Sequence, residues 1–145
     1  MFENKLFSNS SNNALFGYTG FVGSTLQTFY KFDYLYNSKN IENAKNKTFN
    51  TIIISCIPAT KWYSNKYPEE DISTINYIKE IFKTIKANNV ILISTIDIYH
   101  NTGIELNEKS DIDYEKNHTY GKNRFLFEDF IKNTFINPYI IRLPA

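Results

Sequence analysis

The sequence predicts an α/β fold: a doubly wound parallel sheet of about five strands in a three-layer α/β/α arrangement. Two observations predict it. Short apolar runs, typical of buried strands, alternate along the chain with segments in which apolar residues recur at helical spacing. Near the N-terminus a glycine-rich turn separates the first of these strands from the first of these helices. No internal repeat interrupts the alternation, and 145 residues suit one domain.

The glycine-rich turn follows a strand expected at 14–16 and precedes a helix expected at 21–31, whose apolar face holds Val22, Leu26, Phe29 and Tyr30. Strand, glycine turn and helix open a dinucleotide-binding fold, in which the glycines allow a tight turn, close approach of a pyrophosphate and close helix packing. The helix N-terminus adds free N–H groups and a positive dipole. We therefore expect cofactor contacts from Gly17, Thr19, Gly20, Phe21, Val22 and Gly23. An ordinary glycine turn is the alternative.

The second strand is expected at 34–36, and the residues after it should bind the adenosine ribose of a dinucleotide. This place holds Asn37, Ser38 and Lys39, with no carboxylate to bind the ribose hydroxyls. Ser38 and Lys39 suit a 2′-phosphate, or they form a solvated turn. The cofactor is therefore expected to be NAD or NADP, and Lys39 favours NADP.

The middle of the chain supplies the next strand and a loop. Residues 39–50 are polar and too few for a helix plus a strand, so this crossover is short. The β-branched run 51–57 predicts a strand buried on both faces, which stops at Pro58 and Ala59. Pro58 and Ala59 then reach the cofactor edge. Residues 60–68 are expected to form a loop whose aromatic side chains either cover a ligand or pack.

The second half of the chain repeats the alternation. A helix is expected at 71–86, ended by Asn88 and Asn89, and then a strand at 90–94. A polar loop at 100–119, a helix at 120–135 and a strand at 139–143 follow. With right-handed crossovers, the predicted spatial order of the strands is 2-1-3-4-5. The acidic residues of the 100–119 loop either meet a substrate or are solvated.

The reactive side chains gather where ligands bind in such folds, outside the carboxyl ends of the strands. Ser94 and Thr95 bring hydroxyls just past the fourth strand, and Ser94 is expected to touch the cofactor. Tyr120 and Arg124, four residues apart, share one face near the start of the last helix. A fixed cation favours a phenolate. Hydroxyl, phenol and cation beside a dinucleotide predict proton transfer coupled to hydride transfer.

Four motifs carry a family resemblance: GYTGFVG at 17–23, STIDIY at 94–99, YGKNR at 120–124 and IRLP at 141–144. The chain resembles the extended short-chain dehydrogenase/reductases, the NAD-dependent epimerase/dehydratase group, which act mostly on nucleotide sugars. The resemblance implies a Rossmann-like fold, a nucleotide-sugar substrate, and catalytic roles for Thr95 and Tyr120. Arg124 stands where the family usually has lysine, and we expect it to keep that residue's charge.

The predicted function is therefore an NAD(P)-dependent epimerase, dehydratase or reductase acting on a nucleotide sugar. A non-catalytic NAD(P)-binding module or sensor is the alternative, and a structural fragment without ligand is a third. In the family, the resemblance implies, the segment after the last strand supplies a C-terminal substrate domain, and we expect this domain to be absent from residues 1–145. We expect these residues to form only the NAD(P)-binding domain, after a loose lead-in at 1–12, and to associate with a second copy as a homo-oligomer.

Composition excludes several other classes of function. The net charge of +1 gives no reason to expect a nucleic-acid or membrane partner. No apolar run approaches the ~20 residues of a membrane span, and no signal-peptide core is present, so a cytoplasmic protein is expected. The single cysteine, Cys56, excludes an internal disulfide. His100 and His118 lack metal-ligand spacing, so no metal site is expected.

Overall fold

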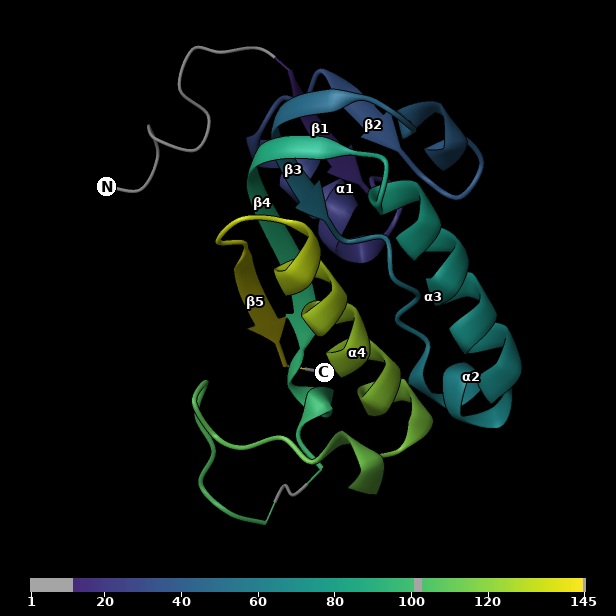
Figure 1. The fold of residues 1–145 in the computed structure, drawn as a ribbon, viewed down its shortest axis with the longest axis vertical. Coiled ribbons are helices and arrows are strands. Elements are labelled where there is room, and N and C mark those ends of the chain that lie inside the picture. Colours follow the sequence, from purple (N-terminus) through teal and green to yellow (C-terminus); the bar gives the residue numbers. More distant parts are fainter. Residues whose placement is uncertain (1–11, 101–102, 145) are drawn as a thin grey trace.

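The computed structural model describes residues 12–100 and 103–144, which form a five-stranded sheet with helices on both faces (Figure 1). The strands lie in the order β2-β1-β3-β4-β5, and every neighbouring pair is parallel. This confirms the predicted fold class and strand order. The strands are β1 (Asn13–Phe16), β2 (Tyr34–Tyr36), β3 (Thr48–Ile54), β4 (Lys86–Thr95) and β5 (Tyr139–Leu143).

Four α-helices connect the strands in the described part of the chain. One face of the sheet carries α1 (Phe21–Phe29), and the other carries α3 (Pro68–Phe82) and α4 (Thr119–Thr134) (Figure 1). The short α2 (Lys61–Lys66) lies between β3 and α3. Helix α3 begins at a proline, whose fixed φ suits the first helical position, and its first turn is acidic, which complements the helix dipole.

The larger hydrophobic core lies between the sheet and the α3–α4 layer. Phe82 of α3 packs against Phe16 of β1, with ring centroids 4.8 Å apart, and against Phe127 of α4 at 6.5 Å. On the opposite face Leu15 and Ile53 are buried in a smaller cluster that includes Leu26 of α1. Because β1 and β3 are buried on both faces, their apolar residues form continuous runs in the sequence.

Strands β3 and β4 differ from their predicted bounds. The strand expected at 51–57 occupies Thr48–Ile54, so the last part of the apolar run has already left the sheet. The strand expected at 90–94 begins at Lys86, and Asn88 and Asn89 lie inside it rather than ending a helix. Asn89 is accommodated there because its side-chain amide donates to the carbonyl of Asn50 on β3, at 3.3 Å.

The helices also depart from expectation. The predicted loop at 60–68 contains α2, and α3 begins at Pro68 and ends at Phe82 rather than spanning 71–86. Helix α1 ends at Phe29, short of residue 31, and Gly23 is its buried residue. Of the residues expected on its apolar face, Phe29 is 75% and Tyr30 40% exposed, and Tyr30 lies just beyond the end of the helix. The β2–β3 crossover is short, as predicted, and holds one 3₁₀ turn, Ile41–Ala44.

Within 12–100 and 103–144, no helix is both long and apolar enough to cross a bilayer. The cytoplasmic location stays a prediction. The expected lead-in lies outside the described residues except for Asn12. Burial raises the pKa of Cys56 to about 12, so its side chain stays a neutral thiol in the core.

Truncating the central aromatic residue of the core should be costly. Phe82→Ala should lower the free energy of unfolding by about 3–5 kcal/mol, since it leaves a cavity between Phe16 and Phe127. Phe29→Ala is the matched control, because this ring is 75% exposed, and its effect should stay within about 0.5 kcal/mol. Urea denaturation measures both, and equal losses would contradict the assignment of the core.

Candidate nucleotide-binding cleft

A cleft of about 330 Å³ opens at the carboxyl edge of the sheet, where ligands bind in parallel α/β folds. It is lined by residues from the start of α1, the segment after β3, α2, β4 and the turn that follows it, α4 and the end of β5. The predicted site residues that line it are Val22, Pro58, Ala59, Ser94, Thr95, Tyr120 and Arg124. The cleft also contains Lys61 and Asp97, which the sequence analysis did not identify.

Two of the three loop glycines are required by close packing. Gly17 has a φ of +92°, and a side chain there would collide with the backbone of Ser55 beyond β3. A side chain on Gly23 would collide with the carbonyl of Gly17. Only glycine allows β1, the loop and α1 to approach this closely.

Gly20 differs from the other two glycines because it faces open space. Its φ of −78° is ordinary for any residue, and an added Cβ would meet only the carbonyl of Gly17, at 3.5 Å. No side chain caps α1 at Gly20. The first N–H groups of a helix have no intrahelical acceptor, so those of Phe21, Val22 and Gly23 can bind an anion. Thr19 and Phe21 are exposed beside them. The open space beside Gly20 and the free N–H donors at the start of α1 together fit a pyrophosphate.

The turn after β2 is held by its own asparagines. The Asn37 side chain accepts from the N–H of Lys39 at 2.9 Å, and the Asn40 side chain accepts from the N–H of Asn37 at 2.7 Å. Ser38 and Lys39 are exposed at the end of this edge strand. Their exposure is compatible with both interpretations, the 2′-phosphate site and the solvated turn.

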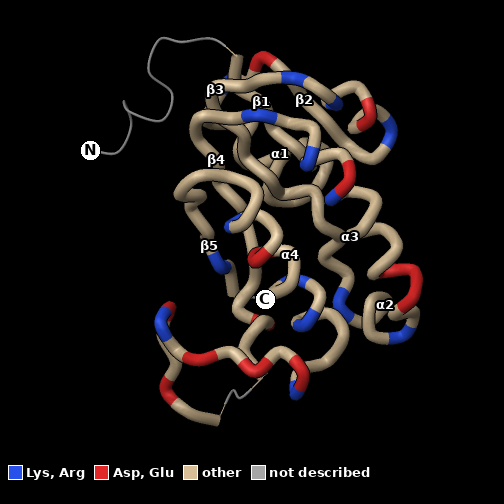
Figure 2. The backbone as a smooth tube through the Cα atoms, viewed as in Figure 1, with Lys and Arg blue, Asp and Glu red and all other residues tan. Residues whose placement is uncertain are grey.

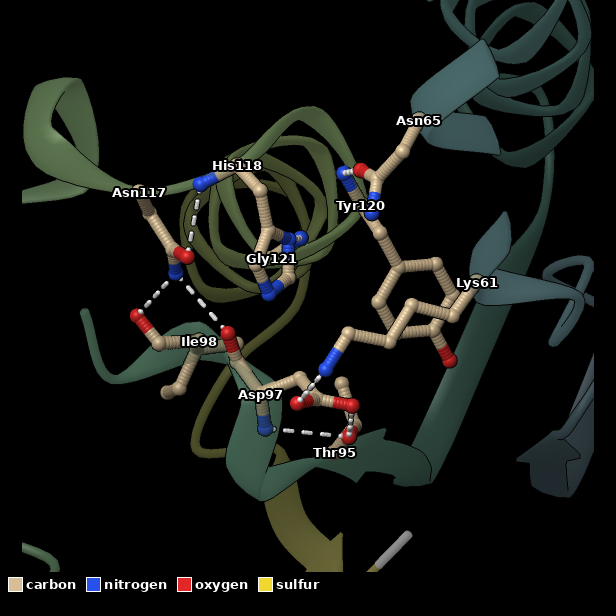
Figure 3. A network of polar contacts seen from close by, with 9 residues as sticks. All are labelled: Lys61, Asn65, Thr95, Asp97, Ile98, Asn117, His118, Tyr120 and Gly121. Carbon is tan, nitrogen blue, oxygen red and sulfur yellow. Dashed lines mark hydrogen bonds and ion pairs between the residues drawn. The ribbon is translucent and has the colours of Figure 1, made fainter. Parts of the chain in front are cut away.

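Thr95, the last residue of β4, is buried and begins a polar network (Figure 3). Its hydroxyl oxygen accepts from the N–H of Asp97 at 3.1 Å and caps the 3₁₀ turn Ile96–Ile98. The carboxylate of Asp97 forms an ion pair with the ammonium of Lys61, the first residue of α2, at 2.6 Å. Helix α2 is therefore fixed to the end of β4.

Tyr120, the second residue of α4, is held beside this network by the helix N-terminus (Figure 3). Its N–H donates to the side chain of Asn65 on α2 at 2.9 Å. The next N–H, that of Gly121, donates to Nδ1 of His118 at 3.1 Å. The Asn117 amide donates to the carbonyl of Asp97 at 2.8 Å, and Gly121 has no room for a Cβ against that carbonyl. These contacts bring Tyr120 to Thr95.

Arg124 lies under Tyr120 in a buried ion pair. Its guanidinium carbon stands 4.1 Å from the centroid of the Tyr120 ring, over the ring face rather than the hydroxyl. Nη1 donates to Asp71 of α3 at 2.6 Å, and Nη2 donates to the carbonyl of Pro58. Asn123 and Ser64 also donate to Asp71, at 2.7 and 2.6 Å. The resulting unit joins α2, α3, α4 and the segment after β3.

The pKa shifts follow from this burial and charge. Burial raises the pKa of Tyr120, and Arg124 opposes that rise, so the phenol keeps its proton at neutral pH. Burial would raise the pKa of Asp71, but hydrogen bonds from Arg124, Ser64 and Asn123 outweigh it and hold the pKa below its usual value. Tyr120 is therefore available as a proton donor, while Asp71 stays charged.

Ser94 is positioned differently from Thr95. Its hydroxyl donates to the buried carboxylate of Glu128 on α4 at 2.6 Å, and Glu128 also pairs with Arg142 of β5 at 2.8 Å. Ser94 lines the cleft, but its hydroxyl belongs to this structural network.

Among the described residues no cluster of histidine, cysteine and carboxylate side chains could hold a metal ion.

Most of the residues that sequence reasoning missed come from α2 and the turns beside it. Lys61 and Asn65 were hidden inside the predicted loop at 60–68, and only their position just after a predicted strand could have indicated them. Asp71 was read as the ordinary start of a helix. The HTYGKNR run at 118–124 contains the His118 cap. It could have been found from the spacing of helix caps, in which a side chain at the N-cap accepts from the backbone N–H three residues later.

The fold resembles solved structures of dTDP-4-dehydrorhamnose reductases. The Yersinia enterocolitica protein aligns with a TM-score of 0.70 and 15% identity, over 93% of this chain and 53% of that protein. The Bacillus anthracis protein, solved with NADP, aligns with a TM-score of 0.70 and 15% identity, over 93% of this chain and 54% of that protein. The Clostridium acetobutylicum protein aligns with a TM-score of 0.65 and 17% identity, over 90% of this chain and 52% of that protein.

These likenesses confirm the Rossmann-like fold. The chain spans about half the length of these solved proteins. No protein-family model matches the sequence, and no curated protein matches it.

Removing the charge of Asp71 should destabilise the fold. Asp71→Asn leaves the guanidinium of Arg124 buried without a counter-charge, so the free energy of unfolding should fall by about 3 kcal/mol or more. Glu69→Gln, in the same turn of α3 but exposed, is the control. Denaturant titration measures both, and a small loss for Asp71→Asn would show that the pair is not needed.

The histidine cap should make stability depend on pH. Partial burial and the charge of Lys61 lower the pKa of His118 below 6.5 in the folded state. As the pH falls below 6.5, the unfolded chain takes up a proton that the folded chain does not, so stability decreases toward the lowered pKa. His118→Asn keeps a capping oxygen without titrating. Unfolding at about pH 7.5 and about pH 5.5 should then show a smaller difference than in the parent.

Proposed function

We propose that this chain binds NAD or NADP in the cleft and is the cofactor-binding part of an NAD(P)-dependent enzyme acting on a nucleotide sugar, by a reductase or epimerase/dehydratase reaction. The observation that carries the proposal is that the glycine loop, Thr95 and Tyr120 meet at one edge of the sheet. The neighbours named as dTDP-4-dehydrorhamnose reductases, one of them in complex with NADP, support a reductase.

The glycine loop is the proposed pyrophosphate site. The N–H groups of Phe21, Val22 and Gly23 donate to the phosphates, and Gly20 leaves them room. Lys39, with Asn37 and Ser38, meets the adenosine ribose, and its charge favours the 2′-phosphate of NADP. Gly17, Thr19, Pro58, Ala59 and Ser94 complete the proposed cofactor site.

Thr95 and Tyr120 carry the proposed proton transfer. NAD(P)H, when bound, supplies the hydride that a substrate carbonyl carbon accepts. Thr95 donates a hydrogen bond that orients the carbonyl oxygen, and Tyr120 gives that oxygen its phenolic proton, which leaves an alcohol and a phenolate. Arg124 stabilises the phenolate through the ring face. Solvent then returns a proton to Tyr120.

Self-association of the chain is also proposed. Strand β5 ends the sheet, and Tyr139 and Ile141, which share the face of Ile91, are 61% and 45% exposed. An exposed edge with apolar side chains favours pairing with another sheet. A homo-oligomer through this edge would cover them.

The alternative is a dinucleotide-binding module or sensor without turnover. The observation that favours it is the commitment of Arg124 to Asp71 and Pro58, which takes two of its nitrogens away from any ligand. Binding of NADP without oxidation of NADPH by any keto-sugar nucleotide would support the module over the enzyme.

Substitutions at Gly20 test the binding proposal without straining the fold. Gly20→Val should abolish NADP binding because its branched side chain fills the open space, and Gly20→Ala should weaken binding less. The backbone conformation of Gly20 suits any residue, so both variants should fold. Calorimetric titration measures the affinity, and unchanged binding by folded Gly20→Val would contradict the pyrophosphate site.

Removal of the Tyr120 hydroxyl tests the reaction. Tyr120→Phe should lower turnover by a factor on the order of 10² with little change in NADP affinity. Tyr77→Phe, an exposed phenol on α3, is the control and should keep parent turnover. NADPH oxidation with a panel of keto-sugar nucleotides measures both. Full turnover by Tyr120→Phe would exclude the proton-transfer role.

A further inference from the structure

The phenolate that Tyr120 forms in the proposed reaction needs a cation near its oxygen. Arg124 meets the face of the ring and is bound through Nη1 to Asp71 and through Nη2 to Pro58. Its side chain is only 5% exposed, so the guanidinium is fixed in that position. It cannot move to the hydroxyl without leaving Asp71 as an unpaired buried charge.

Lys61 is the other cation at this end of the cleft. It lines the same cleft as Thr95 and Tyr120, and Figure 3 shows its side chain extending from α2 past Tyr120 to Asp97. Asp97 takes one of the three N–H donors of the ammonium, at 2.6 Å. The side chain is 46% exposed, so the other donors are free to turn toward the cleft.

We infer that Lys61 is a positioning residue that stabilises the phenolate of Tyr120, while Asp97 holds its ammonium at the Thr95 end of the cleft. The inference deepens the proposed function and depends on it for its role in the reaction. In the proton transfer the phenolic O–H bond breaks, the substrate oxygen takes the proton, and the negative charge stays on the Tyr120 oxygen. The ammonium of Lys61 donates a hydrogen bond to that oxygen until solvent reprotonates it.

Several charged groups face Tyr120, so the effect of Lys61 has to be separated from theirs. Burial raises the pKa of Tyr120, Arg124 and Lys61 lower it, and Asp97 and Asp71 raise it. His118 stands with its ring centroid 6.3 Å from that of Tyr120. If Lys61 only neutralises Asp97, its removal would act on Tyr120 through the freed carboxylate and not directly.

A fluorine titration separates these two explanations. Difluorotyrosine, a more acidic phenol, is placed at position 120 by nonsense suppression, and its ¹⁹F shift is followed against pH in the chain without cofactor. Four proteins are compared: the parent, Asp97→Asn, the double variant Lys61→Met with Asp97→Asn, and Lys66→Met. Lys66 is the matched control because it lies on the same helix but over the ring of Tyr67.

The decisive comparison is between Asp97→Asn and the double variant, in which the Asp97 charge is absent from both. If Lys61 acts on the phenol, the pKa at position 120 rises in the double variant relative to Asp97→Asn, and Lys66→Met titrates like the parent. An equal pKa in Asp97→Asn and the double variant would overturn the inference. Thermal unfolding checks that each variant is folded.

Turnover supplies the second readout. Lys61→Met should lower kcat about tenfold or more, and Lys61→Arg, which keeps a cation, should recover part of it. The titration uses the chain without cofactor, so its outcome does not depend on whether NADP binds. Failure of the parent to bind NADP would defeat the proposed function and leave the titration result intact.

Discussion

The buried ion pair between Arg124 and Asp71 is the interaction on which the geometry of the site depends. Both residues are almost fully buried, and their partners come from α2, from α4 and from the segment after β3. A buried ion pair adds little net stability, but losing one partner is costly. Its contribution here is therefore positional: it fixes where α3, α4 and Pro58 meet, and thereby where the Tyr120 ring lies.

This constraint divides the charged groups of the cleft between two tasks. Arg124 has a fixed place under the aromatic ring, whereas Lys61 is half-exposed and, among the described residues, its ammonium pairs with Asp97. In Figure 2, basic and acidic residues occur along the described chain from Lys31 onward, whereas the glycine loop and α1 carry none. A group that must respond to a forming phenolate needs freedom to move, and among these two only Lys61 has it.

The fold could be predicted from the sequence because its elements are repetitive and buried. The apolar runs of β1 and β3 and the glycine loop fix a parallel sheet, and right-handed crossovers then bring Thr95 and Tyr120 to one edge. The contacts that hold those residues could not be predicted. Asn65 and Lys61 lie on a helix of six residues, too short to show periodicity. Asn88 and Asn89 suggested a helix end because their partner, Asn50, is distant in sequence.

We propose that the carboxyl edge of this sheet binds a nicotinamide dinucleotide through the glycine loop. An ¹⁵N-resolved NMR titration of the chain with NADP⁺ tests it most directly, because every amide reports its own environment. We expect saturable shifts of the amides of Gly20, Phe21, Val22 and Gly23, together with those of Thr95 and Tyr120. No saturable shift, or shifts confined to residues outside the cleft and the loop, would contradict it.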